Sequence, residues 1–156
     1  MPRHLIAIIA TLVLGAAPLP AADSFIERRL HDAVTVMQEP PTPGVKDGPL
    51  ERGTRMLLAD GALEAQVPAY AAMLAGQFEV LGRPTGVTEL GVRRFGARAE
   101  VAYFIIPCAR GVAFVRVVAL KAGDNNRVVS ELVVSQHPSE VLPPDLLTPE
   151  IQLPPR

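Results

Sequence analysis

Few residues of this sequence have the types and spacing that a chemical site requires. The histidines are His4, His31 and His137, and their spacing does not suggest zinc, which takes clustered His and Cys ligands. Cys108 is the only cysteine. Arg110 nearby would lower the pKa of its thiol, but a cysteine after an apolar run is usually a small hydrophobic residue. The sequence therefore predicts no metal, no cofactor and no catalytic nucleophile.

Acid–base chemistry would need a carboxyl group and a hydroxyl group on one surface. Glu100 is the only acid in the middle of the two central predicted strands. The tyrosines, Tyr70 and Tyr103, both fall on stripes expected in the core. A small enzyme or small-molecule binder with Tyr103 or Glu100 in a pocket between helices and sheet is the alternative to a non-catalytic protein.

Four strands are predicted from β-branched and aromatic residues bounded by Gly, Pro, Asn and Asp. They are Val87–Phe95, Arg98–Ile106, Val112–Lys121 and Arg127–Gln136. The short connections make consecutive strands antiparallel neighbours. The expected sheet is a meander.

Three helices are predicted before the sheet, at Ser24–Gln38, Leu50–Ala59 and Leu63–Leu81. Apolar residues recur at helical spacing in each, and Pro68 should separate a short turn from the main third helix. In the first helix the apolar stripe is Ile26, Leu30, Ala33, Val34 and Met37. Ser24 and Glu27 form a capping box. The predicted fold class is α+β, with three helices on one face of a four-stranded antiparallel meander.

The central hairpin, with a turn centred near Ala109, would place Tyr103 opposite Val115. The helices should then cover Ala99, Val101, Tyr103, Ile105, Ala113, Val115, Val117 and Ala119. The other face would carry Glu100, Ala102, Phe104, Ile106, Val112, Phe114, Arg116, Val118 and Leu120. Both faces are mostly apolar, whereas a half-exposed sheet should alternate apolar and polar residues.

An apolar second face of this kind indicates an interaction surface. The candidate binding residues are Tyr103, Phe104, Phe114 and Arg116. Arg116 either pairs with Glu100 or anchors an anionic ligand. We expect Phe104, Ile106, Phe114 and Val118 to be covered by the C-terminal tail or by a second copy in a homodimer, with an unknown protein or small ligand as further partners.

The ends of the chain differ from the domain between them. Residues 1–22 have a basic start, an apolar run of 13 residues at Leu5–Ala17 and a small-residue end, which is typical of a signal peptide. That run is too short to span a bilayer comfortably. The predicted organisation is a leader over 1–22, one domain over 23–137 and a Pro-rich tail over 138–156.

The tail is either disordered or an extended arm on apolar surface. The protein should be exported, periplasmic or secreted, without a transmembrane segment in the mature chain.

Charge is balanced overall, with a formal net charge of −1, which argues against a nucleic-acid partner. Locally it is uneven, because residues 83–127 hold eight Lys and Arg against three acids. The simpler interpretation is mutual neutralisation with the helices and the tail. The alternative is a basic strip of Arg93, Arg94, Arg98 and Arg110 for anionic lipid or polysaccharide, which would be discontinuous because Arg110 lies at the opposite end of the strand.

Residues 81–134 resemble a group of small exported bacterial proteins of the nuclear transport factor 2-like, or cystatin-like, cone fold. The similarity is in Leu81-Gly82-Arg83-Pro84-Thr85-Gly86, the Phe95-Gly96-Ala97-Arg98 turn, Val101-Ala102-Tyr103, Gly111, Arg116 and the Gly-Asp-Asn turn before Val128. The resemblance implies the fold and no assigned reaction. Isomerases of the cone fold use an Asp base with a Tyr–Asp oxyanion hole, and no Asp lies in a predicted strand here. We therefore expect an exported, non-catalytic binding or assembly module.

Overall fold

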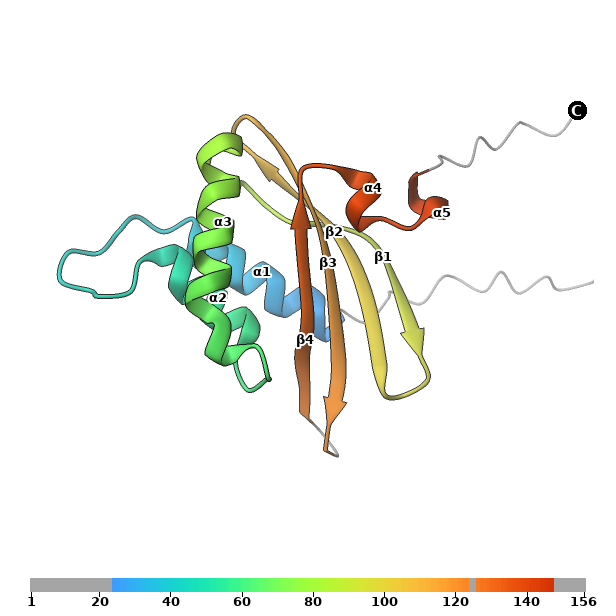
Figure 1. Cartoon of the computed structure of the whole chain (residues 1–156). Coiled ribbons are helices and arrows are strands. Elements are labelled where there is room, and N and C mark those ends of the chain that lie inside the picture. Colours follow the sequence, from blue (N-terminus) through green and yellow to red (C-terminus); the bar gives the residue numbers. More distant parts are fainter. Residues whose placement is uncertain (1–23, 124–125, 148–156) are drawn as a thin grey trace, which may run out of the picture.

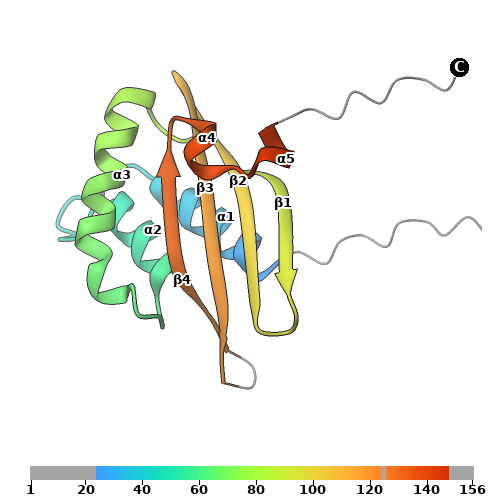
Figure 2. The ribbon, with the colours of Figure 1, turned by 45° about the vertical axis from the view of Figure 1, so that its right-hand side comes forward.

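The structure is a computed structural model that describes residues 24–123 and 126–147. Within these ranges three α-helices precede a four-stranded antiparallel sheet and two short helices follow it, which confirms the predicted α+β class and meander (Figure 1). Helices α1 (Phe25–Met37), α2 (Pro49–Leu58) and α3 (Val67–Leu81) cover one face, called the inner face. Helices α4 (Pro138–Val141) and α5 (Pro144–Leu147) lie on the opposite, outer face (Figure 2).

Helix α1 is fixed by its cap and by one apolar stripe. The Ser24 hydroxyl accepts a hydrogen bond from the backbone N–H of Glu27 at 2.9 Å, as the capping box predicts. The buried side chains of the helix are those of the predicted stripe: Ile26, Leu30, Ala33, Val34 and Met37. Periodicity alone was sufficient here because only one side of α1 is apolar.

Helix α2 packs closely on α1 at Gly53. A Cβ atom added there would lie 2.5 Å from the carbonyl oxygen of Ala33 and 2.6 Å from Cγ of Met37. Arg29 joins the same two helices by donating to the carbonyl oxygens of Met56 at 2.8 Å and Ala59 at 3.0 Å. These bonds satisfy carbonyls that the end of α2 leaves without intrahelical partners.

We expect Gly53→Ala to lower the free energy of unfolding by about 1–3 kcal/mol, because the added methyl group overpacks against backbone. The loss should occur although alanine is the better helix former by about 1 kcal/mol. Gly76→Ala in α3 is the matched control, since nothing lies within 4 Å of its added Cβ. Urea denaturation should show a small gain for the control; a gain at both positions would contradict the close helix contact.

The third helical region begins with the 3₁₀ turn η1 (Glu64–Gln66), and α3 follows with Pro68 in its first turn. Its buried residues are Val67, Leu74 and Leu81, each two turns apart. Gly82 ends the helix with φ of +80°, a conformation that favours glycine.

The sheet consists of β1 (Thr88–Phe95), β2 (Ala99–Cys108), β3 (Gly111–Ala122) and β4 (Asn126–Ser135), paired in chain order. The β1–β2 and β3–β4 connections lie at one end of the sheet, and the β2–β3 turn lies at the other (Figure 1). At that other end Arg110 N–H donates to the carbonyl of Leu81 at 2.8 Å, which ties the β2–β3 turn to the end of α3.

The predicted register of the central hairpin is wrong by one residue. Tyr103 pairs with Arg116, and Phe104 pairs with Val115. The turn contains only two residues between the paired Cys108 and Gly111. A shift of one residue moves every side chain of β2 to the opposite face. The prediction for β3 holds, whereas the two faces of β2 are exchanged.

The exchange changes the composition of the core. Ala102, Phe104 and Ile106 face the helices, and Tyr103 and Val101 face α4 and α5. The expectation that Phe104 and Ile106 would need cover on the outer face is therefore wrong. The apolar pattern could not select the register, because both faces of β2 carry apolar residues.

Candidate functional site

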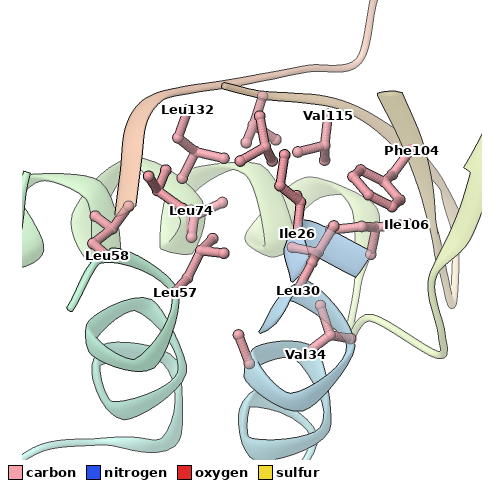
Figure 3. Close-up of a cluster of buried hydrophobic side chains, with 14 of the residues drawn as sticks. Ile26, Leu30, Val34, Leu57, Leu58, Leu74, Phe104, Ile106, Val115 and Leu132 are labelled. Atoms are coloured by element: carbon pink, nitrogen blue, oxygen red, sulfur yellow. The ribbon is translucent and has the colours of Figure 1, made fainter. Parts of the chain in front are cut away.

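The space between the helices and the inner face is filled by apolar side chains (Figure 3). A cavity of about 10 Å³ remains there, which is the size of a single water molecule. Its lining residues are Leu30, Val34, Met37, Leu57, Leu74, Phe78, Ile106, Val115, Leu132 and Val134. The cavity is too small for an organic ligand, and its lining side chains supply no polar group.

Glu100 and Tyr103, the residues expected to serve a pocket, lie on opposite faces of β2. Glu100 belongs to the inner face and is 1% exposed, while Tyr103 packs in the cluster of the outer face. Tyr70 is half-buried against the inner core. The structure therefore brings neither tyrosine together with Glu100 in a cavity.

Of the four candidate binding residues, Phe104 is fully buried in the inner core, so its predicted place on the outer face is wrong. Tyr103 and Phe114 lie on the outer face and pack in one cluster with Val141 and Leu142. Leu146 of α5 packs against the same cluster. The part of the tail that the structure describes, 138–147, thus rests on apolar surface as two helical turns, each beginning at a proline, and not as an extended arm.

Arg93 of β1 forms an ion pair with Asp145 of the tail. Its guanidinium donates to both carboxylate oxygens of Asp145 and lies 6.0 Å from the centroid of the Tyr103 ring. The hydrogen bond from Arg93 lowers the pKa of Asp145. Because the folded-state pKa is lowered, this contact stabilises the fold above the ordinary Asp pKa of about 3.9 and is lost as the pH falls through the lowered value.

We expect Leu142→Ala to lower the free energy of unfolding by about 2 kcal/mol, because Leu142 is 7% exposed and its removal opens the outer cluster. Leu147→Ala in α5 is the control, since that side chain is 40% exposed. Thermal unfolding of both variants should separate them. Equal, small effects would mean that α4 does not rest on the sheet in solution.

Arg116 does not pair with Glu100. Its guanidinium donates to the carboxylate of Glu131 on the neighbouring strand β4, and both side chains are partly exposed. The predicted Glu100–Arg116 pair is wrong for the same reason as the register, since the shift of β2 carries Glu100 to the inner face.

Glu100 is instead held at the end of the sheet where β1 meets β2. Arg127 Nη1 donates to its Oε2 at 2.6 Å, and Arg94 Nε lies 3.9 Å from the same oxygen. The other oxygen, Oε1, has no hydrogen-bond partner among the residues that the structure describes. A buried carboxylate with two arginines on one oxygen acts here as a structural ion pair.

Cys108 is half-buried at the end of β2, and burial raises the pKa of its thiol. Its Sγ donates to the carbonyl of Ile106 at 3.5 Å. Arg110 does not activate it, because that guanidinium donates to the carbonyl of Glu79. The raised pKa favours the protonated thiol at neutral pH, which is the less reactive form.

A groove of about 590 Å³ lies on the surface between α1 and α2. Its charged lining residues pair with one another, Arg52 with Glu39 at 2.5 Å and Arg55 with Asp47 at 2.9 Å. Since each of these charges has a partner, the groove offers a ligand little charge recognition.

The predicted basic strip is divided by the fold. Arg93 is engaged with Asp145 on the outer face, and Arg110 lies at the opposite end of the sheet. Arg94 and Arg98 remain together beside the β1–β2 turn. The strip of these four arginines is discontinuous, as the position of Arg110 at the other end of the strand predicts.

Two further cations join Arg94 and Arg98 through strand pairing. Lys121 pairs with Arg127, and the backbone N–H of Lys121 donates to the carbonyl of Arg98 at 2.7 Å. We call this group the basic end of the sheet: Arg94, Arg98, Lys121 and Arg127. Sequence reasoning missed Lys121 and Arg127. Their position beside the β3–β4 turn could have shown that they meet the β1–β2 turn.

An apolar row crosses the outer face at the same end. Phe95 pairs with Ala99, Ala99 with Leu120, and Leu120 with Val128. Phe95 is 60% exposed and Leu120 is 43% exposed. We call these four residues the apolar row. Helices α4 and α5 lie toward the other end of the sheet and leave it uncovered (Figure 2).

The described ranges, 24–123 and 126–147, contain no group of three or more His, Cys, Asp or Glu side chains placed to hold a metal ion. None of the helices in these ranges is long and apolar enough to cross a membrane. Comparisons with family models, curated proteins and solved structures found no match.

Proposed function

We propose that this chain is an exported, non-catalytic binding or assembly module that works from the surface of its sheet. The observation that carries the proposal is the contrast between the two faces. The interior, where a ligand pocket would lie, is packed with apolar side chains around a cavity of about 10 Å³. The outer face presents Phe95 and Leu120, which are 60% and 43% exposed.

The cone fold of the nuclear transport factor 2-like group is part of this proposal. Its support is the order of the elements, since helices α1 to α3 precede a four-stranded meander and cover one of its faces. An enzyme or small-molecule binder of that fold would need the interior space to open, and the apolar lining of that space supplies no group for chemistry.

Export is proposed from the leader pattern of residues 1–22, which lie outside the described residues. N-terminal sequencing of the protein recovered outside the cytoplasm should begin close to Asp23. A soluble cytoplasmic protein that retains Met1 would refute export and leave the binding proposal untouched.

Methyl-labelled NMR spectroscopy tests the site of binding, with 8-anilinonaphthalene-1-sulfonate as an apolar probe. We expect shifts of the Leu120 and Val128 methyl groups, and none at Leu74 or Val115 beside the interior cavity. Shifts confined to Leu74 and Val115 would show that the interior opens, and the pocket-based alternative would then replace this proposal.

The homodimer predicted from the sequence would use the same outer face and is the rival occupant of that surface. Helices α4 and α5 occupy the half that contains Tyr103, so a second copy would have to contact the apolar row. Size-exclusion chromatography with light scattering tests this arrangement. A dimer that Leu120→Ser converts to a monomer would support it.

A further inference from the structure

We propose that the basic end and the apolar row together dock this protein on an anionic lipid bilayer. The inference rests on the proposed function, because it names the partner of the same surface. It goes further because it names the chemistry of the partner, which is a surface with negative headgroups over an apolar layer.

The apolar part of the surface is made by two side chains on different strands. Ala99 pairs with both Phe95 and Leu120, so the two larger residues flank it in one row of the outer face. Both are exposed, at 60% and 43%. Phe95 is followed directly by the Gly96 turn, which places it at the extreme end of β1. Because the row lies at the tip of the sheet, its side chains can enter a bilayer while the rest of the domain stays outside.

The charged part lies at the same strand ends. Each large apolar residue has a cation as its chain neighbour, Arg94 before Phe95 and Lys121 after Leu120. Alternation along a strand places the cations on the inner-face side of the sheet and the apolar residues on the outer side. Long cationic side chains can reach headgroups while their apolar neighbours enter the acyl boundary.

The cations at this end differ in how they are paired. Glu100 is the buried acid among them, and Glu89 also interacts electrostatically with Arg94. Arg127 and Arg94 share Glu100, whereas Arg98 and Lys121 are exposed and show no side-chain ion pair among the described residues. These two cations are available to anionic headgroups.

This combination favours a bilayer over the other occupants of the surface. A second copy packed symmetrically on the apolar row would bring two basic ends close together, and like charges repel. A soluble anionic polymer would neutralise the cations but would not use Phe95 and Leu120. An anionic bilayer uses both.

Co-sedimentation with vesicles tests the inference. It uses the exported form of the protein and matched variants of that form. We expect binding to vesicles that contain phosphatidylglycerol and at least tenfold weaker binding to pure phosphatidylcholine. Arg98→Gln and Lys121→Gln should each weaken binding about fivefold. Phe95→Ser and Leu120→Ser should each weaken it about tenfold. Raised salt should weaken it too, because the charges are exposed.

The control variants are Arg83→Gln and Val80→Ser, which alter an exposed cation and an exposed valine away from this end. They should bind as the wild type does. Equal binding to both kinds of vesicle, or equal loss in the control variants, would overturn the inference. So would vesicle binding that Phe95→Ser and Leu120→Ser both leave unchanged, because the cations alone would then account for it.

Three further outcomes separate this inference from the proposed function. If the apolar probe shifts the Leu120 methyl groups but no vesicle binds, the surface binds another partner and only the lipid inference fails. A dimer that Leu120→Ser dissociates would assign the row to a second copy. A Leu120→Ser variant with a clearly lowered urea midpoint and no vesicle binding would show that the chain itself covers the row. Each of these results also overturns the lipid inference.

Discussion

Replacing Arg127 with alanine should lower the free energy of unfolding by about 3 kcal/mol, because it leaves the carboxylate of Glu100 buried without its close partner. Glu100 is 1% exposed, and Arg127 Nη1 is its hydrogen-bonded cation at 2.6 Å. Arg94 compensates only in part, since its Nε is 3.9 Å away and its side chain is 61% exposed. Urea denaturation of the purified variant measures the effect.

Arg116→Ala is the matched control for Arg127→Ala. It also breaks an arginine–glutamate pair within the sheet, but its partner Glu131 is 47% exposed and can be hydrated. Exposed pairs contribute about 0–1 kcal/mol, so the control should lose less than 1 kcal/mol. The double variant Glu100→Met with Arg127→Ala should regain most of the stability, because no charge is then left buried. Similar losses of unfolding free energy in both single variants would refute the claim that the buried Glu100–Arg127 pair matters more than an exposed pair.

Phe104→Ala should cost about 3–5 kcal/mol, because Phe104 is fully buried and its removal leaves a cavity between the sheet and the helices. The same substitution at Phe114 should cost about half as much, since that side chain is partly buried against the smaller outer cluster. Chemical denaturation of the two variants compares the two faces directly.

The ranking of these two variants tests the register of the central hairpin. In the observed register Phe104 faces the helices and Phe114 faces α4. A one-residue slip of β2 would place both phenylalanines on the outer face. If Phe114→Ala proves more costly than Phe104→Ala, the register in solution is the slipped one, and the assignment of Tyr103 to the outer face fails with it.

Much of the fold could be predicted from local patterns. The stripe of α1 and its Ser24 cap were predicted residue by residue, because one side of that helix is apolar and the cap needs only neighbours three positions apart. The strands were predicted to within a few residues because Gly, Pro and Asn bound them. The meander followed from the short connections, which leave antiparallel pairing as the simple arrangement.

The candidate surface could be predicted only in part. Arg94 and Arg98 were recognised, since they flank one turn, and Arg110 was correctly placed at the opposite end of the strand. Lys121 was missed, because its nearness to Arg98 depends on the pairing of β2 with β3.

The sequence by itself determined which elements form and in what order, because capping, periodicity and turn residues act over a few neighbouring positions. Tertiary structure alone decided which face of β2 is buried. Apolar residues on both sides left two registers equally compatible with the pattern, and the two-residue turn between Cys108 and Gly111 selected one of them. That selection buried Phe104 and Glu100 and turned Tyr103 toward α4. The contacts involved join residues far apart in the chain, so no local pattern records them.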